Sequence, residues 1–234
     1  MKTLRVAVLF LVCLTHSVAY SIYFNSLNIR AFDGTNGIGE VDIYEFIDYI
    51  NVDDEIQIDV SIIFNSNRRI PSKMFGYGWW FGLTDSYISK VSHDSYKFVK
   101  PNRDELILRQ DLKNKKRFNS EISRHKLEKE GNGYLIYGCC GESFFYEKNI
   151  LTQTRYENGT VLSYKYEKGK LKEVISNNKP VLSFRYENDD VIYMDLIEKK
   201  RTIRFKLMEV PGYGKLLSEY ADFPEAKRLK KFSY

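Results

Sequence analysis

The sequence FYEKNIL at residues 145–151 returns twenty residues later as KYEKGKL at 165–171, and after twenty more as RYENDDV at 185–191. The second residue of each copy is a tyrosine: Tyr146, Tyr166 and Tyr186. A fixed period of this length is typical of repeat proteins, in which each unit is one supersecondary structure that packs against its neighbours.

Between these copies, apolar and polar residues alternate. In VLSY at 161–164, which recurs as VLSF at 181–184, every second residue falls on the same side of an extended chain. Asn, Asp and Gly separate the runs, for example at 167–169 and 177–179, and these residues tolerate the positive φ angles of tight hairpin turns. Each repeat is therefore predicted to be two short strands and two turns.

These repeats predict the fold class. One hairpin cannot bury its apolar face alone, so neighbouring hairpins must lie side by side. We predict an all-β protein in which tandem antiparallel β-hairpins form a curled open sheet or a partial β-shell, with little helix beyond a short one at residues 224–231. Residues 43–50 are ambiguous, because their apolar residues fit the spacing of either a helix or a strand.

A second pattern precedes the repeats. The alternation of Ile and Val with polar residues over 56–62 predicts a strand that leads to Asn65 and Ser66. After a polar loop the chain continues as FGYGWW at 75–80. The two glycines of this segment can take backbone angles closed to other residues, which lets another strand or an aromatic ring approach closely.

Together the two patterns resemble those of the YD-repeat family, which includes the Rhs (rearrangement hotspot) and teneurin-like proteins. The resemblance covers residues 55–205, about two thirds of the chain, and the patterns occur in the family's order. The residues that match the family's motifs are Asn65, Ser66, Gly76, Gly78, Tyr146, Tyr166, Gly169 and Tyr186. The chain departs from the family where Glu follows each tyrosine in place of Asp, and where Asn149 and Asp189 replace the glycine.

The resemblance implies a hollow β-shell, which in the Rhs and toxin-complex relatives encloses a C-terminal toxin. We expect this chain to be too short to fill that role alone. About sixteen strands at ~4.8 Å spacing would close into a barrel only ~25 Å across, and side chains would fill most of its interior. The roughly thirty residues after Phe205 are also too few for a separate toxin domain.

The N-terminus has the pattern of an export signal. Lys2 and Arg5 precede an apolar run at 6–14, and residues 17–19 have the small-x-small form of a signal peptidase site. We therefore predict a cleaved signal peptide over 1–19 and a protein that is secreted, periplasmic or at the cell surface. No second apolar span follows, so we expect no transmembrane segment after cleavage.

The predicted division of the chain has four parts: a signal peptide (1–19), an N-terminal β region with the glycine-tryptophan motif (20–140), the YD-like repeats (141–206) and a C-terminal tail (207–234). Removing Lys2 and Arg5 lowers the formal net charge from +5 to +3, which is too mild to indicate a nucleic-acid partner. Exposed edge strands would allow pairing with a second copy or with a larger Rhs-type protein.

Trp79 and Trp80 are the candidate ligand-binding residues. In an extended strand they point to opposite faces, so we expect only one of them to enter the core readily. If the other stays exposed, it offers an aromatic platform for a cell-surface glycan or a peptide. The alternative is that both residues belong to a packing corner.

Cys139 and Cys140 are the only cysteines after residue 19. Three interpretations stay open: a vicinal disulfide, an intermolecular bridge, or two small residues at a tight turn before Gly141. The two histidines in the same part of the chain, His93 and His125, have no Cys or His at metal-ligand spacing. We expect no metal, no cofactor and no catalytic residues, because no hydrolase or phosphate-binding motif is present.

The sequence therefore predicts a secreted β-sheet protein that acts as a non-catalytic binding or structural module at the cell envelope. One alternative is a shortened remnant of an Rhs toxin shell without an activity of its own. A second alternative, from a different class, is an enzyme that acts on cell-wall polysaccharide.

Overall fold

The structure is a computed structural model that describes residues 25–30, 40–65, 71–224 and 229–233. Every regular element in these residues is a β-strand, so the predicted all-β class is confirmed. Among them, no helix has the length and apolar character needed to cross a membrane. The predicted signal peptide at 1–19 and the motif residue Ser66 lie outside the described residues.

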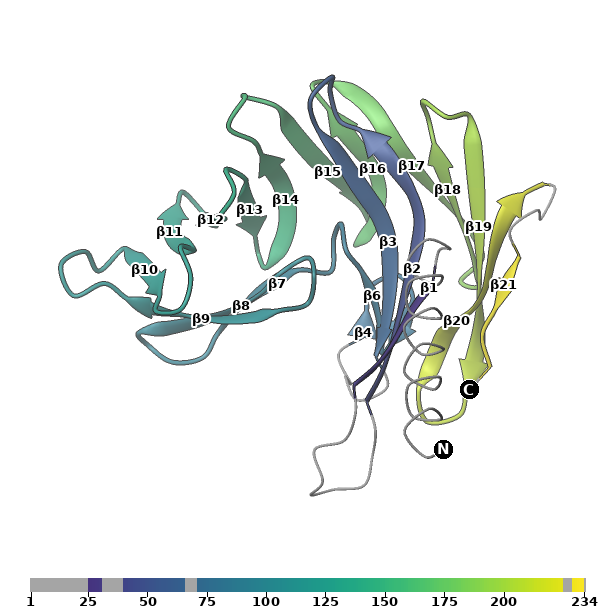
Figure 1. The fold of residues 1–234 in the computed structure, drawn as a ribbon, viewed down its shortest axis with the longest axis horizontal. Helices are drawn as coiled ribbons and strands as arrows, with labels where there is room; N and C mark the ends of the chain where they lie inside the picture. The colour runs from purple at the N-terminus through teal and green to yellow at the C-terminus, as the bar shows by residue number, and fades with distance from the viewer. Residues whose placement is uncertain (1–24, 31–39, 66–70, 225–228, 234) are drawn as a thin grey trace, which may run out of the picture.

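Most of the described chain forms one long antiparallel sheet of 15 strands (Figure 1). Its strands follow the chain in order: β7 Tyr87–Lys90, β8 Ser95–Val99, β9 Glu105–Gln110, β10 Arg117–Ser120, β11 Lys126–Glu130, β12 Gly133–Tyr137, β13 Ser143–Glu147, β14 Ile150–Arg155, β15 Val161–Glu167, β16 Lys170–Ser176, β17 Lys179–Glu187, β18 Val191–Leu196, β19 Arg201–Val210, β20 Gly214–Phe223 and β21 Lys230–Lys231. The sheet curls but stays open, with β7 at one edge and β21 at the other.

A second sheet lies against the long one, which curves around it (Figure 1). We call it the inner sheet. Its strands, in spatial order, are β1 Asn25–Arg30, β2 Glu40–Asn51, β3 Gln57–Asn65 and β6 Trp79–Phe81. A small pair, β4 Pro71–Ser72 with β5 Gly76–Tyr77, precedes β6. The ambiguous residues 43–50 are thus in a strand, and a bulge between Phe46 and Asp48 lets both Ile47 and Ile50 be buried.

The repeats form the predicted side-by-side hairpins. Lys168 and Gly169 at the β15–β16 turn have φ angles of 50° and 79°, and Asn177 and Asn178 at the next turn have 45° and 68°. Asn149, which stands where the second repeat has Gly169, also takes a positive φ of 63°. Asn is among the few residues that adopt this conformation at low cost, so the substitution preserves the turn.

The repeat tyrosines occupy equivalent places, as their spacing predicts. The Tyr166 hydroxyl donates a hydrogen bond to the carbonyl of Leu151 at 3.1 Å, and the Tyr186 hydroxyl donates to the carbonyl of Leu171 at 2.9 Å. Each tyrosine therefore ties its hairpin to the strand fifteen residues earlier. Tyr146, at the start of the series, is fully buried and instead donates to the Ser86 hydroxyl at 2.8 Å.

The glycine-tryptophan motif packs on the repeats. The Phe75 ring lies 4.9 Å from that of Phe205, and the Phe81 ring lies 6.2 Å from that of Phe184. Gly76 has a φ of 85°, and a Cβ placed there would lie 2.0 Å from the Lys215 carbonyl oxygen of β20. These contacts join the inner sheet to the long sheet through residues that the sequence places in separate motifs.

The helix predicted at 224–231 is wrong where the structure describes it. Lys230 and Lys231 form β21, which pairs with β20, and residues 225–228 lie outside the described residues. The returning chain gains backbone hydrogen bonds with β20 and places Phe232 4.7 Å from the ring of Trp79. Burial of an aromatic ring outweighs a weak helix preference.

The long sheet also runs without a break across two of the predicted part boundaries. Strand β12 pairs with β13 on either side of residue 140, and β19 continues from Arg201 to Val210 across residue 206. The first residues of the predicted tail, 207–223, therefore extend the sheet that the repeats begin.

Candidate binding groove

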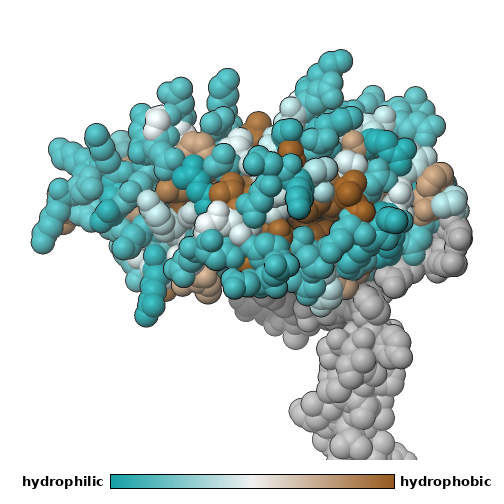
Figure 2. Space-filling model, turned by 90° about the horizontal axis from the view of Figure 1, so that it is seen from above, coloured by the Kyte–Doolittle hydropathy of each residue, from teal (hydrophilic) through white to brown (hydrophobic). Residues whose placement is uncertain are grey.

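A groove opens between the inner sheet and the β13–β15 part of the long sheet, with a volume of about 280 Å³. Four aromatic rings line it, and they define what we call the tyrosine groove: Tyr44 of β2, Phe144 of β13, Tyr156 beyond β14 and Tyr164 of β15. Seen from above, apolar residues gather near the middle of the molecule and hydrophilic residues border them (Figure 2).

Polar groups of β3 face the same groove. Asp59 and Ser61 lie on the side of the strand opposite Val60 and Ile62, which are fully buried. The Tyr44 hydroxyl donates to the Asp59 carboxylate at 3.4 Å, and burial followed by the charge of Asp59 raises the pKa of Tyr44. The groove thus offers a carboxylate and hydroxyl groups beside aromatic faces.

Tyr156 stands at an acidic side of the groove. Burial, and then the nearby carboxylates of Glu142 and Asp53, raise the pKa of Tyr156 to about 12. Between the neighbouring strands β14 and β15, the hydroxyls of Thr154 and Tyr164 form a hydrogen bond with each other at 3.1 Å. All these tyrosines are therefore neutral at physiological pH, and Tyr156 presents a neutral hydroxyl close to carboxylates.

The prediction that only one tryptophan enters the core is wrong, because Trp79 and Trp80 are 1% and 3% exposed. Strand β6 is covered on both faces: Phe64 and Phe232 pack on Trp79, while Tyr87 packs on Trp80. Neither ring offers a platform at the surface, so the packing-corner interpretation holds.

Trp80 nevertheless acts on the groove indirectly. Its indole N–H donates to the Pro101 carbonyl at 2.7 Å and so holds the β8–β9 turn, which contributes Pro101 and Asn102 to the groove wall. In the same turn Arg103 has a positive φ of 73°. Trp80 is therefore a positioning residue for a wall of the groove.

Cys139 and Cys140 lie in the turn between β12 and β13, away from the groove lining. Both are exposed free thiols, and their sulfur atoms are 3.1 Å apart. Gly141 follows with a φ of 88°, as expected for a tight turn. Neither cysteine is bonded to the other in the structure.

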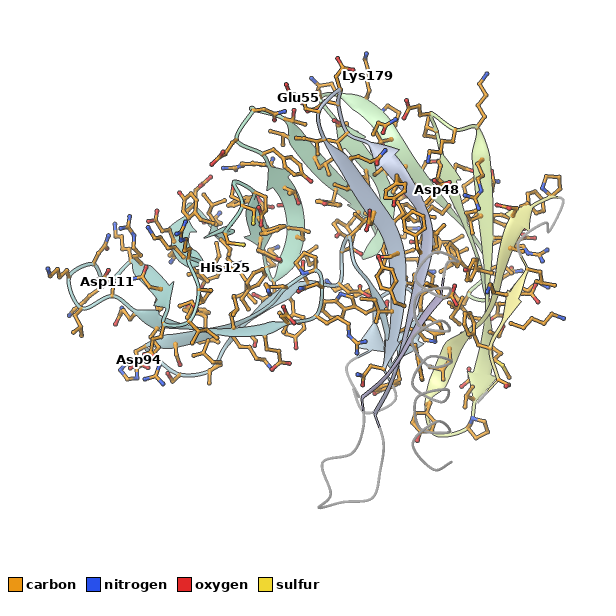
Figure 3. All side chains as sticks on the ribbon, viewed as in Figure 1. Asp48, Glu55, Asp94, Asp111, His125 and Lys179 are labelled. Carbon is orange, nitrogen blue, oxygen red and sulfur yellow. The ribbon has the colours of Figure 1, made fainter. Side chains whose placement is uncertain are left out.

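In the described part of the chain, His93 and His125 do not belong to a group of side chains that could hold a metal ion. His125 is buried, and its Nδ1 lies 3.0 Å from the Ser123 hydroxyl, while burial and then Lys100 lower its pKa. Among the described residues, no group of three or more His, Cys, Asp or Glu side chains is placed to hold a metal ion. Figure 3 shows Asp94 and Asp111 on the arm formed by β8–β11, well away from Asp48 and Glu55 of the inner sheet.

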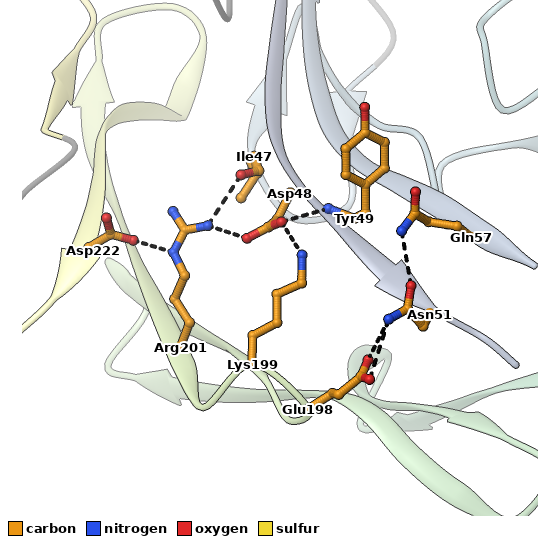
Figure 4. Close-up of polar contacts among 9 residues, drawn as sticks. All are labelled: Ile47, Asp48, Tyr49, Asn51, Gln57, Glu198, Lys199, Arg201 and Asp222. Carbon is orange, nitrogen blue, oxygen red and sulfur yellow. Dashed lines mark hydrogen bonds and ion pairs between the residues drawn. The ribbon is translucent and has the colours of Figure 1, made fainter. Parts of the chain in front are cut away.

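A cluster of ion pairs holds the inner sheet to the long sheet (Figure 4). The Asp48 carboxylate of β2 accepts hydrogen bonds from Lys199 and Arg201, and Arg201 also donates to Asp222 of β20 at 2.6 Å. Nearby, the Asn51 side chain donates to Glu198 at 3.1 Å. The opposite charges of this cluster pair with one another, so we assign the cluster a role in holding the two sheets together.

The tyrosine groove was not predicted from the sequence. In the sequence, Asp59 and Ser61 are only the polar residues that alternate with Ile and Val in a predicted strand. Tyr44 lies in the segment 43–50, which fits either a helix or a strand. One signal was present, namely that Asp59, Ser61 and Ile63 share a face of the strand. Which surface that face meets depends on contacts between residues about 100 positions apart.

The fold and the groove define a class: an open antiparallel β-sheet protein with a second sheet packed against the curl and an aromatic groove between the two. No protein-family model matches the chain, and no curated protein matches it either.

Proposed function

We propose that this chain is an exported YD-repeat-like β-sheet protein that acts as a non-catalytic binding module at the cell envelope. The observation that carries the proposal is the tyrosine groove, where four aromatic rings and a carboxylate converge between the inner sheet and the repeats. Concave sites lined by aromatic rings with a few polar groups are the usual form of ligand-binding sites.

The composition of the groove favours binding over hydrolysis. Asp59 is the only carboxylate among the described residues that line it. Hydrolysis of a glycosidic bond normally requires two carboxyl groups facing each other across the bond. A single carboxylate that already accepts a hydrogen bond from Tyr44 is suited to holding a ligand in place.

Two structural features support the kinship with YD-repeat proteins. The tyrosine hydroxyls of successive repeats make the same hydrogen bond to the preceding unit. The glycine-tryptophan motif packs its Phe75 and Phe81 on the aromatic residues of the repeats. The two patterns therefore contribute to one shared aromatic core.

A partner strand would join this protein at a defined edge. Strand β20 already pairs with β21, and its Leu217 N–H donates to the Phe75 carbonyl at 3.0 Å, so that edge is partly occupied. Strand β7 ends the sheet on the other side. Self-association through the long sheet, or pairing of that sheet with a longer relative, would use β7, and the mass in solution measured by light scattering tests for self-association.

The test of the binding function uses isolated cell envelopes of the producing organism and the purified protein without residues 1–19. We expect saturable co-sedimentation that Tyr156→Ala weakens about tenfold or more, since the change removes both a ring and a hydroxyl from the groove. Tyr213→Ala is the matched control, because Tyr213 is 58% exposed and lies outside the groove. Equal binding by the two variants would rule out the groove as the site.

A further inference from the structure

The tyrosine groove differs in charge from the protein as a whole. The chain has a formal net charge of +5, yet the described residues that line the groove include Asp59 and neither lysine nor arginine. Glu142 and Asp53 act on Tyr156 from outside the lining. An anionic ligand would therefore lose its hydration without a cationic partner among the described residues that line the groove, which is costly in a partly buried site.

The four aromatic rings of the groove do not stack on one another. In the described structure, no two of Tyr44, Phe144, Tyr156 and Tyr164 make a ring contact with each other. A tight cage for a single small cation would need rings close together around one point. Separate rings instead suit an extended ligand that presents several apolar faces in sequence.

Hydrogen-bonding groups lie between these rings. Asp59 provides an acceptor and Ser61 a hydroxyl, and the Tyr156 hydroxyl has no hydrogen-bond partner among the described residues. A hydroxyl can donate and accept at once, so this set is matched to a ligand rich in hydroxyl groups. The volume of about 280 Å³ is just below the usual range of ~300–1,000 Å³ for small-molecule sites, so the groove takes a short segment of a chain at a time.

We propose that the tyrosine groove binds a glycan without anionic groups, made of neutral or amine-bearing sugars. Sugar rings stack their C–H faces on Tyr44 and Tyr156, while their hydroxyl or amine groups bond to Asp59 and Ser61. The inference rests on the proposed binding function and adds the class of ligand to it.

The experiment measures binding by titration calorimetry with three tetrasaccharides of equal length. They are a neutral one (N-acetylglucosamine tetramer), an amine-bearing one (glucosamine tetramer) and an anionic one (galacturonic acid tetramer). We expect the first or second to bind and the third not to bind. Asp59→Asn should weaken binding of the amine-bearing sugar about tenfold or more, because it removes the opposite charge.

Two further variants separate a lost contact from a lost fold. Tyr156→Phe keeps the ring and removes the hydroxyl, so we expect an intermediate loss of affinity, whereas Tyr213→Ala should bind like the parent. Circular dichroism confirms that each variant is folded. Binding of the anionic tetramer as tight as that of the others would overturn the inference.

The possible failures are distinguishable. If Tyr156→Ala reduces binding to envelopes but none of the three sugars binds, the ligand class is wrong and the binding function stands. If Tyr156→Ala leaves envelope binding unchanged and no sugar binds, both proposals are wrong.

Discussion

At the scale of single residues, the repeat is held by one recurring hydrogen bond. The hydroxyls of Tyr166 and Tyr186 each reach the carbonyl of a buried leucine in the preceding unit, Leu151 and Leu171. Burial raises the pKa of both tyrosines, so the hydroxyls stay protonated and keep donating. A phenylalanine would fill the same space but leave the carbonyl without this donor.

We expect Tyr166→Ala to lower the free energy of unfolding by about 3 kcal/mol, the low end of the range for buried aromatic residues, because the Tyr166 ring is partly buried against the core. Tyr166→Phe should cost about 1 kcal/mol, the usual worth of one hydrogen bond. Urea denaturation followed by circular dichroism measures both, with exposed Tyr213→Ala as the control. If Tyr166→Ala unfolds at the same urea concentration as the parent, the residue does not stabilise the core.

A second residue, the buried Asp85, lowers the stability of the folded protein at neutral pH. Asp85 is 5% exposed and accepts a hydrogen bond from the Phe81 N–H at 2.8 Å. Burial, partly offset by hydrogen bonds and by Lys73, raises its pKa to about 6. The folded state therefore binds a proton between about pH 4 and 6 that the unfolded state has lost, so this group makes the protein less stable as pH rises through that range.

Asp85→Asn removes this dependence. We expect the variant to be more stable than the parent at pH 7.5 by up to about 3 kcal/mol, and to lose that advantage near pH 4. Thermal unfolding of both proteins from pH 4 to 8 gives the difference directly. A difference that does not change with pH would show that Asp85 is ionised in the folded protein throughout.

At the scale of elements, the glycines of the glycine-tryptophan motif and those of the repeats have different structural roles. Both Gly76 and Gly169 have positive φ angles, 85° and 79°. A Cβ at Gly76 would lie 2.0 Å from the Lys215 carbonyl oxygen, whereas a Cβ at Gly169 meets nothing within 4 Å. Gly76 is needed for the close approach of β5 and β20, and Gly169 only for the shape of its turn.

Gly169→Ala should therefore cost about 1 kcal/mol, the backbone strain alone. We expect Gly76→Ala to cost more than about 3 kcal/mol, because the strain is joined by a clash with backbone that cannot move away. Denaturation of the pair measures the contrast. Equal losses would mean that β5 and β20 separate without cost.

At the scale of the whole molecule, the tip of the β2–β3 hairpin is fastened to successive turns of the long sheet. Asp53 accepts hydrogen bonds from Thr160 and Asn158, the Val52 carbonyl accepts one from Ser176 at 2.5 Å, and Asn51 bonds to Glu198. The cluster around Asp48 completes the series. Together these contacts keep the inner sheet in place against the long sheet, and residues of both sheets line the tyrosine groove.

Asp48→Ala should lower the free energy of unfolding by about 2 kcal/mol, since it removes charge-assisted hydrogen bonds to Lys199 and Arg201. Burial alone would raise the pKa of Asp48, but the bonds from Lys199, the Tyr49 N–H and Arg201 outweigh it and lower the pKa. The parent should therefore lose this contribution as pH falls below about 4.

Denaturation at pH 7 and pH 3 checks this expectation, with Asp54→Ala as the control because Asp54 is exposed in the same hairpin turn. Hydrogen exchange should also show faster exchange in β2 and β3 of the Asp48→Ala variant. Equal effects of the two substitutions would show that the cluster contributes nothing to stability.

Much of the architecture was predictable because it depends on local patterns. The twenty-residue period, the alternation within each unit and the turn residues predicted the hairpins from β13 to β18 and the equivalence of Tyr166 with Tyr186. The prediction failed for residues 224–231 and for Trp80, where contacts between different strands decide the outcome. Whether Lys230 joins a helix or a strand depends on whether another strand pairs with it. Whether the strand face at Trp80 is exposed depends on whether another segment packs on it.

The sequence by itself determined that this is a repeat of antiparallel hairpins, since strand alternation and turn chemistry are properties of neighbouring residues. Only the tertiary structure decided that a separate sheet lies against the curl, that both tryptophans are buried and that Tyr44, Asp59 and Tyr156 share a groove. The physical reason is that these residues come from different strands, and that the two walls of the groove are about 100 positions apart in the chain. Their proximity is determined by the packing of the two sheets, which a local sequence pattern does not predict.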